Sequence, residues 1–319
     1  MGLGFIGQEL VKAALRSPEL DLVGAVDLNP AFAGRPLSEI VPGAPKVLVG
    51  ESLEDVLGKK RGVVLLHATG SRMPQVIDQL LEAVRLDVAV VSTCEELAFP
   101  YLRHPELAEK LDRAARRNGV SVVGTGVNPG FVLDRLVATV GQVSGPIRHA
   151  SASRVVDART RREALQRKIG AGLSEDVFMS RLDSEGLGHV GLVESAALVA
   201  MGLGLDCDDF EEEIAPVVAE EDIHGGAFVV RKGQVAGIAQ TAVALEEGQE
   251  RVRLALTIAV GADSPGDRIE IDADPKVTLE IKGGVAGDSA TANLVVNAAP
   301  RVRVAEAGLL TVLDLPAGR

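Results

Sequence analysis

The feature that most constrains the fold is a glycine-rich segment near the start of the chain. Gly2-Leu3-Gly4-Phe5-Ile6-Gly7 fits the pattern Gly-x-Gly-x-x-Gly, and a stretch with helical spacing, Gln8 to Arg16, follows directly. Asp27 stands about twenty residues further on, at the end of a predicted strand. In such a unit the first glycine permits a tight turn, the second lets the backbone approach a pyrophosphate, and the third allows close helix–strand packing.

The spacing of loop and carboxylate predicts a dinucleotide-binding Rossmann domain. The alternative is a coincidental glycine turn followed by a strand-end aspartate, since the chain has 35 glycines. We expect the carboxylate to accept hydrogen bonds from the adenosine ribose, which favours NAD because its charge repels a 2′-phosphate. Arg35 lies in a nearby loop, so NADP remains possible. The predicted cofactor residues here are Gly2, Gly4, Phe5, Ile6, Gly7 and Asp27.

The first half of the chain alternates short β-branched runs with amphipathic stretches. This alternation predicts a doubly wound parallel sheet with helices on both faces, the α/β class. The expected strands are Asp21–Asp27, Lys46–Val49, Gly62–His67, Val88–Ser92 and Val120–Val123, and the expected helices are Gln8–Arg16, Ser52–Leu57, Met73–Val84 and Pro105–Asn118.

The position of the glycine loop conflicts with this fold. The loop normally follows the first, central strand of the sheet, and here only Met1 precedes it. An absent central strand would leave buried backbone groups unpaired, at about 1–3 kcal/mol each. We therefore expect a first strand truncated by a start codon placed about seven to ten residues too late. An intact-mass measurement on the native protein tests this expectation.

The second half has a different pattern, with longer strands joined by tight turns. It predicts an α+β domain with an antiparallel sheet and helices on one side. The predicted boundaries give a nucleotide-binding domain at 1–127, completed by 285–319, and a substrate-binding and dimerisation domain at 128–284. The expected strands are Ile147–Asp157, Phe228–Val230, Val235–Leu245, Val252–Val260 and Val277–Ile281, and the expected helices are Thr160–Ile169, Ser174–Arg181, His189–Met201 and Ala290–Ala299.

Composition argues against several classes of function. The formal net charge of −12 disfavours nucleic-acid and anionic-membrane partners. The basic stretch Arg159 to Lys168 is better explained as a helix face or substrate-side cluster. Two cysteines and five scattered histidines give no disulfide framework and no metal-ligand spacing, so we expect no metal. No signal peptide or membrane-length apolar run is visible, which makes the cytoplasm the default location.

Two segments follow predicted strands at the edge where such sheets bind ligands. His67-Ala68-Thr69-Gly70 has small residues that suit a backbone passing close to a cofactor, and Ser92-Thr93-Cys94-Glu95-Glu96 has two adjacent carboxylates. Ala68, Thr69 and Thr93 complete the predicted cofactor site. The carboxylates are explained equally well as a helix start, where they complement the dipole, or as a general acid or base. Cys94 is expected to be a buried small residue rather than a nucleophile.

The segment Gly124-Thr125-Gly126-Val127-Asn128-Pro129-Gly130-Phe131 has the strongest turn signal of the chain. It is predicted to be a hinge between domains, and a hinge that passes over the cofactor also lines the active cleft.

These segments resemble those of a known family. GTGVNPGF at 124–131 and VSTCEEL at 91–97 are similar to the 2,4-diaminopentanoate dehydrogenases and related native amine dehydrogenases, distant relatives of dihydrodipicolinate reductase. RVVDARTRREALQRKIGAG at 154–172, GDSATANLVVNAAP at 287–300 and GLLTVLDLP at 308–316 extend the resemblance over essentially the whole chain.

The resemblance implies reversible NAD(P)-dependent oxidative deamination of an amine, with ketone and ammonia as the other reactants, by a homodimer formed through the second domain. It also implies that Glu95 is the catalytic carboxylate. Asn128 and Phe131 would line the substrate pocket. Arg154, His189 and Thr291 are further substrate candidates, although His189 is explained nearly as well as a helix cap and Arg154 as part of a solvated face.

Two other functions stay open. One is a cyclic imine reductase on the dihydrodipicolinate reductase scaffold, although the paired-histidine segment of that enzyme is absent. The other is a dinucleotide-binding redox sensor without turnover, which has no need for a carboxylate beside the nicotinamide. The identity of the substrate lies beyond the sequence, because fold does not fix function.

Overall fold

The computed structural model describes residues 1–185 and 187–318. The chain forms two compact units, Met1–Phe131 with Ala286–Arg319, and Val132–Val285. The first crossing therefore lies four residues after the predicted boundary at 127/128, and the return lies at 285/286 rather than 284/285. The predicted fold class, a parallel Rossmann-like sheet with a second α+β domain, is confirmed.

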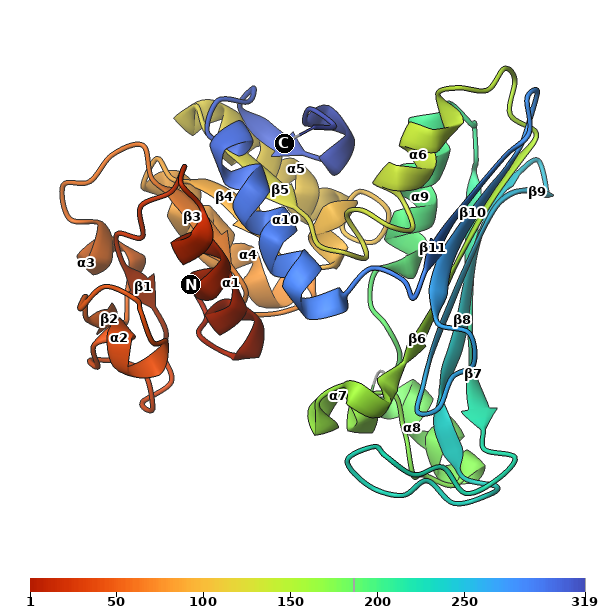
Figure 1. Ribbon diagram of the computed structural model, residues 1–319. Helices are drawn as coiled ribbons and strands as arrows, with labels where there is room; N and C mark the ends of the chain where they lie inside the picture. Colours follow the sequence, from red (N-terminus) through yellow and green to blue (C-terminus); the bar gives the residue numbers. More distant parts are fainter. Residues whose placement is uncertain (186, 319) are drawn as a thin grey trace. The chain divides into compact units, whose positions relative to one another are not determined.

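The first unit contains a four-stranded, all-parallel sheet with the order β12-β5-β4-β3 (Figure 1). All residues of β4 and β5 are buried, as expected for strands covered on both faces. Helices α4 and α5 share one apolar cluster with the strands, and α10 packs on the same strands and on α1. The strands are β3 (Val64–His67), β4 (Ala89–Ser92), β5 (Ser121–Gly124) and β12 (Gly308–Leu310), and the helices are α1 (Phe5–Arg16), α4 (Met73–Arg85), α5 (Pro105–Asn118) and α10 (Gly287–Val302).

The predicted doubly wound sheet is divided. β1 (Ala25–Val26) and β2 (Val49–Gly50) form a separate two-stranded parallel sheet, beside the short helices α2 (Leu37–Ile40) and α3 (Leu53–Leu57). Met1 and Gly2 bridge the two sheets: the Met1 amino group donates to Leu66 O (2.8 Å), and Gly2 N donates to Val26 O (2.9 Å).

Beyond this bridge, a groove of about 620 Å³ separates the facing edges of β1 and β3. Residues of α1 and α10, among them Leu10 and Ala299, also line it.

The second unit is built on a six-stranded mixed sheet with the order β11-β10-β6-β9-β8-β7. Helices α6 and α9 pack on one face of it. The strands are β6 (His149–Asp157), β7 (Asp209–Val218), β8 (Val235–Glu246), β9 (Gln249–Ala259), β10 (Gly266–Asp272) and β11 (Val277–Lys282), and the helices are α6 (Arg135–Gly141), α7 (Glu163–Lys168), α8 (Glu175–Glu185) and α9 (Leu192–Leu203).

Three expectations for this sheet were wrong. The sheet is not wholly antiparallel, because β6 and β9 pair in parallel across a long helical connection. Strands β7 and β10 and helix α6 were missed; β7 carries Glu211 to Glu213 and Pro216 on a sheet edge, where charge and proline suit an unpaired side but hide the strand pattern. Phe228–Val230 is no strand, and Val230 makes an isolated bridge with Ile223.

A buried ion pair joins β6 and β10. Arg154 Nη1 donates to Asp267 Oδ1 at 2.8 Å, and the two side chains are 5% and 2% exposed. Both also bind one backbone residue, because Arg154 Nη2 donates to Val285 O while Val285 N donates to Asp267 Oδ2. The pair therefore fixes the end of the second unit to its sheet.

We expect Asp267→Ala to lower the free energy of unfolding of this unit by about 3–5 kcal/mol, because it leaves a buried guanidinium unpaired. Chemical denaturation measures the loss. Glu280→Ala is the control: it removes an exposed ion pair with Arg268 in the same sheet and should cost under about 1 kcal/mol. Equal small losses in both variants would contradict the stabilising role of the buried pair.

Candidate functional site

The glycine loop has the close packing that its pattern predicts. A Cβ atom on Gly7 would lie 1.8 Å from Gly2 O, and a Cβ atom on Gly2 would lie 2.5 Å from Ala68 O. A Cβ atom on Gly4 would meet no atom within 4 Å. Gly4 is the N-cap of α1, whose first turn contains no acidic residue. The loop thus presents an open helix N-terminus, which suits a phosphate group.

Asp27 is fixed beside this loop. Its Oδ2 accepts from Leu3 N at 2.5 Å and its Oδ1 accepts from Asn29 N at 2.7 Å. Arg35 is directed at its own segment, since its guanidinium donates to Ala31 O (3.1 Å) and pairs with Glu39 (3.4 Å). The carboxylate therefore holds the position predicted for a ribose-binding group.

Backbone hydrogen bonds connect the loops that follow β3, β4 and β5. Thr93 N donates to His67 O at 2.9 Å, and Thr125 N donates to Ser92 O at 2.8 Å. The Oγ1 atom of Thr69 lies within hydrogen-bonding distance of His67 Nε2 and Gln79 Oε1 (2.7 and 2.6 Å). The predicted cofactor residues Ala68, Thr69 and Thr93 thus lie together at the carboxyl edge of this sheet.

The two adjacent carboxylates after β4 have different environments. Glu96 is 3% exposed and accepts hydrogen bonds from Met73 N at 2.7 Å and from Arg72 Nη1 at 3.3 Å. His104 Nε2 lies 2.8 Å from its Oε2. Glu96 therefore binds the start of α4 and the residue before α5, and the helix-start explanation applies to it. Glu95 is half-buried, directly before the 3₁₀ helix η1 (Glu96–Ala98).

Cys94 lies in the same loop and is fully buried. Burial raises the pKa of its thiol to about 12, which keeps the thiol protonated at neutral pH, and the expected burial of this small residue is confirmed.

The segment 124–131 folds tightly against its neighbours. A Cβ atom on Gly124 would lie 2.6 Å from Ala98 N, so this glycine lets β5 approach η1. Val127 N donates to Thr291 Oγ1 at 3.1 Å, which joins α10 to the segment. Asn128 is buried, precedes a cis peptide bond to Pro129, and is followed by the half-buried Phe131. The predicted substrate residues Asn128 and Thr291, distant in sequence, are therefore neighbours here.

The other two substrate candidates belong to the second unit. The guanidinium of Arg154 is engaged by Asp267 and Val285, so the solvated-face explanation is wrong. His189 precedes α9, whose N-cap is Gly191. Its backbone N and O both bond the buried side-chain amide of Gln240, at 2.9 and 2.8 Å. No sequence pattern pointed to Gln240, because its burial depends on the register of the strands.

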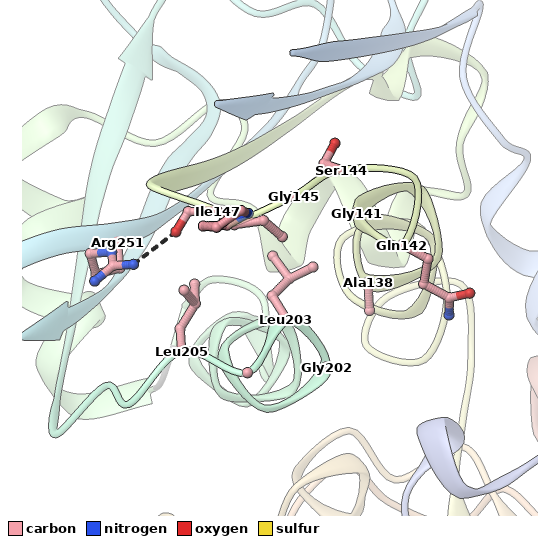
Figure 2. Close-up of a pocket in the computed structure, with 12 residues that line it drawn as sticks. Ala138, Gly141, Gln142, Ser144, Gly145, Ile147, Gly202, Leu203, Leu205 and Arg251 are labelled. Carbon is pink, nitrogen blue, oxygen red and sulfur yellow. Dashed lines mark hydrogen bonds between the residues drawn. The ribbon is translucent and has the colours of Figure 1, made fainter. Parts of the chain in front are cut away.

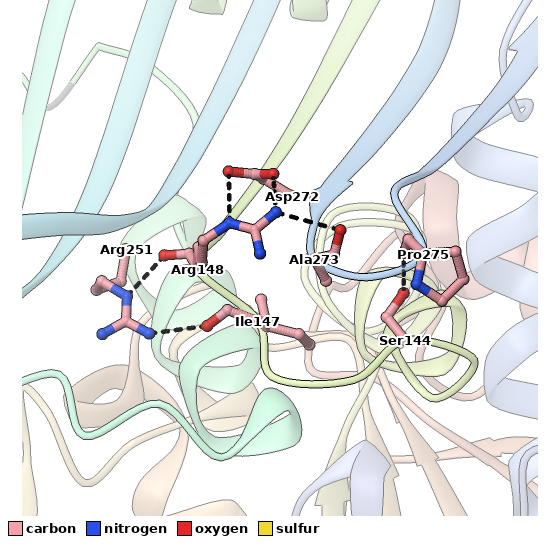
Figure 3. Close-up of polar contacts among 7 residues, drawn as sticks. All are labelled: Ser144, Ile147, Arg148, Arg251, Asp272, Ala273 and Pro275. Carbon is pink, nitrogen blue, oxygen red and sulfur yellow. Dashed lines mark hydrogen bonds and ion pairs between the residues drawn. The ribbon is translucent and has the colours of Figure 1, made fainter.

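A pocket of about 410 Å³ lies in the second unit, beside the ends of α6 and α9 (Figure 2). It contains none of the predicted site residues, and Arg251 is the charged residue of its wall. Arg251 donates to Arg148 O (2.8 Å) and Ile147 O (2.9 Å), and Arg148 in turn pairs with Asp272 (Figure 3). Arg251 also pairs with Glu246. Arg251 is therefore a structural link between β9 and the segment before β6.

The glycine loop, the helix N-terminus and Asp27 fit a nicotinamide dinucleotide, because an open phosphate cradle and a fixed carboxylate stand side by side. Across residues 1–185 and 187–318, no group of three or more His, Cys, Asp or Glu residues could hold a metal ion. Within the same part of the chain, no helix is both long and apolar enough to cross a membrane.

Comparison with known proteins gives a family match over more than half of the chain. The profile of the 2,4-diaminopentanoate dehydrogenase C-terminal domain matches residues 131–319. The 2,4-diaminopentanoate dehydrogenase of Acetoanaerobium sticklandii is 28% identical over 328 residues, covering 100% of this chain and 93% of that protein. An amine dehydrogenase of Streptomyces virginiae is 25% identical over 357 residues, covering 99% and 94%.

Solved structures show the same fold. The amine dehydrogenase from Mycobacterium smegmatis superimposes with a TM-score of 0.84 at 20% identity, over 98% of this chain and 94% of that chain. A dihydrodipicolinate reductase from Paenisporosarcina has a TM-score of 0.53 at 13% identity, over 95% and 92%. The resemblance predicted from the sequence motifs is confirmed.

We expect Glu96→Gln to lower the free energy of unfolding of the first unit by about 1–3 kcal/mol, because it removes the charge that three donors share. Thermal or chemical denaturation measures the loss. In the control Glu109→Gln, an exposed ion pair with Arg113 is removed, and the loss should stay under about 1 kcal/mol. A Glu96 variant as stable as wild type would refute this structural assignment.

Proposed function

Since the chain belongs to the 2,4-diaminopentanoate dehydrogenase family, we propose that it is an NAD-dependent amine dehydrogenase that interconverts a small amine with its ketone and ammonia. The observation that carries the proposal is that the two adjacent glutamates after β4 lie in different environments. Glu96 serves the helices, and Glu95 follows the strand end that also bears Thr93. A carboxylate close to the predicted cofactor residue Thr93 would be placed to move the protons of amine oxidation.

When bound, the dinucleotide accepts hydride from the amine carbon or returns it. The role proposed for Glu95 is proton transfer. Its carboxylate takes a proton from the substrate ammonium, so that the nitrogen lone pair can assist departure of hydride. After this first proton has been released to solvent, the carboxylate takes a proton from the water that adds to the resulting iminium carbon. It passes that proton to the nitrogen of the adduct, and cleavage of the C–N bond with loss of the hydroxyl proton to solvent releases ammonia and the ketone. In the reductive direction the same group supplies these protons.

Asn128, Phe131 and Thr291 are proposed to contact the substrate. Thr291 of α10 accepts a hydrogen bond from Val127 N, next to the buried Asn128, so α10 holds this segment in place. His189 remains a proposal from the second unit, held at its backbone by Gln240. Arg154 is better explained as structural, because its ion pair with Asp267 uses the charge that a substrate carboxylate would need.

We expect the purified protein to oxidise NADH in the presence of 2-amino-4-oxopentanoate or a small ketone only when ammonium is added. Loss of absorbance at 340 nm, a property of NADH, measures turnover. Ammonium-independent reduction of a cyclic imine would instead support the reductase alternative. Tight NADH binding without turnover on any of these substrates would support the redox sensor.

The matched control uses the adjacent carboxylates. Glu95→Gln should reduce kcat by at least about a hundredfold while NADH affinity is retained, because general acid–base catalysis contributes that much. Glu96→Gln, compared at a temperature where it is folded, should retain most of kcat. A fully active Glu95→Gln variant would remove Glu95 from the mechanism.

The proposed preference for NAD over NADP rests on Asp27 and Arg35. A fixed carboxylate repels a 2′-phosphate, and Arg35 is turned to Ala31 and Glu39. We expect Asp27→Ala to weaken NADH binding while leaving NADPH binding unchanged or stronger, so that the ratio of the two dissociation constants falls by at least about tenfold. Fluorescence titration with both cofactors measures the ratio. An equal loss of NADH affinity and NADPH affinity would show that Asp27 only supports the glycine loop.

We further propose that the protein is a homodimer formed through the open face of the second sheet. α6 and α9 cover the other face. Small, partly exposed side chains occupy the middle of the open face, at aligned positions of three neighbouring strands: Ala239, Thr241, Ala255, Thr257, Ser151 and Ser153. Charged residues lie on the same face: Arg253 on the central strand β9, and Arg268 and Glu213 toward the sides.

The size of this face suits a symmetric dimer. Six strands about 4.8 Å apart and seven paired residues about 3.3 Å apart span an area of roughly 29 by 23 Å. That footprint approaches the roughly 800 Å² that each partner buries in a stable interface. A flat face of small residues packs closely on a second copy of itself across a two-fold axis.

We expect Ala255→Arg, in the middle of this face, to convert a dimer into a folded monomer, because two buried guanidinium groups would meet across the axis. Light scattering coupled to size exclusion measures the mass. Val143→Arg, at a residue 66% exposed in a loop, should leave the dimer intact. A wild-type monomer, or an unchanged mass for Ala255→Arg, would rule out this interface.

A further inference from the structure

A histidine is buried at the carboxyl end of β3, the edge strand of the first sheet. His67 is the last residue of β3 and is 0% exposed. Its Nδ1 lies 2.8 Å from Ser92 Oγ at the end of β4. Its Nε2 lies 2.9 Å from Gln79 Oε1 in α4 and 2.7 Å from Thr69 Oγ1. Both ring nitrogens are therefore used, in opposite directions.

The contacts define a continuous chain of hydrogen bonds. Cys94 N donates to Ser92 Oγ at 3.0 Å, which leaves the hydrogen of the Ser92 hydroxyl available for donation to His67 Nδ1. The opposite nitrogen, Nε2, then carries the hydrogen and donates toward Gln79 Oε1, because an amide oxygen can only accept. This chain of hydrogen bonds runs from the backbone N of Cys94, next to Glu95, to the Thr69 hydroxyl.

The imidazole keeps this arrangement over the ordinary pH range. Burial lowers the pKa of His67 to about 4, so the ring is neutral at pH 7 and one nitrogen remains an acceptor. The backbone adds to the same connection, since His67 O accepts from Thr93 N at 2.9 Å. A rigid ring with two opposed nitrogens can bridge these groups, whereas an apolar residue would remove one hydrogen-bond partner from each of Ser92, Gln79 and Thr69.

We infer that His67 is a positioning residue, which links the segment 68–70 to the segment 93–96 and so sets the distance between the cofactor residues Thr69 and Thr93 and the carboxylate of Glu95. The inference rests on the proposed function for its catalytic consequence. It does not place His67 in contact with substrate or cofactor. Displacement of a reacting group by about 1 Å can cost about a hundredfold in rate, so a link of this kind acts on kcat.

The test is Ser92→Ala, which removes one hydroxyl and breaks the chain between Cys94 and His67. We expect kcat to fall by at least about tenfold, with a much smaller change in KM for the ketone. Ser121→Ala is the matched control, because Ser121 is also buried in this sheet and donates to a backbone oxygen, that of Val302. Ser121→Ala should lose similar stability and keep the wild-type kcat.

A second variant separates positioning from stability. If both groups act through one link, His67→Leu combined with Ser92→Ala should lower kcat no further than His67→Leu alone. Additive losses in kcat, or equal kcat values for Ser92→Ala and Ser121→Ala, would overturn the inference.

Two readouts do not depend on turnover. Hydrogen exchange of the protein without cofactor should show faster exchange at residues 93–97 in Ser92→Ala than in Ser121→Ala, and NADH affinity should fall at least about threefold in the former. If wild type shows no ammonium-dependent turnover, the proposed function fails, and these two measurements still test the hydrogen-bonded link through His67. Unchanged exchange and affinity would overturn it.

Discussion

The candidate site depends on one requirement: polar groups buried at the carboxyl edge of the first sheet must all find partners. An unpaired buried donor or acceptor costs about 1–3 kcal/mol, so each partner is strongly specified. Glu96 meets this requirement for the start of α4 and for His104. The chain from Cys94 through Ser92 to His67 meets it between β4 and β3. The loops that bear Thr69, Thr93 and Glu95 are fixed as a result.

Steric fit completes the same edge. Gly7 lets α1 approach Gly2, Gly2 lets the loop approach Ala68, and Gly124 lets β5 approach η1. These contacts leave no room for side chains, whereas Gly4 faces open space. Close backbone packing below and an open face above are what a phosphate-binding loop requires. The same close backbone packing therefore supports both the fold and the proposed cofactor site.

The second unit is organised differently. Its sheet buries one face under α6 and α9 and leaves small side chains on the other. The buried ion pair of Arg154 with Asp267 shows why residue type alone is a weak guide to function. An arginine on a strand suits a substrate carboxylate, yet the register of β6 against β10 places an aspartate beside it. Register is a property of the assembled sheet, and a sequence pattern does not define it.

What the sequence by itself determined was local or periodic. The glycine loop with Asp27, the apolar strands β3 to β5, the helices α4 and α5 and the family resemblance were all predicted, because each depends on residues close together in the chain. Its prediction for the second sheet failed at β7, β10 and the parallel pairing of β6 with β9. β7 is an edge strand with many charges, which hides its strand pattern, and the pairing of distant strands leaves no signal in the sequence.

Tertiary structure decided which of two adjacent glutamates is structural. Sequence spacing left Glu95 and Glu96 equivalent, and the contacts of Glu96 with Met73 and His104 separate them. It also revealed the role of His67, whose partners Ser92, Gln79 and Thr69 come from two strand ends and a helix. The physical reason is the same in both cases. A buried polar side chain is defined by the groups that satisfy it, and those groups meet only when the chain is folded.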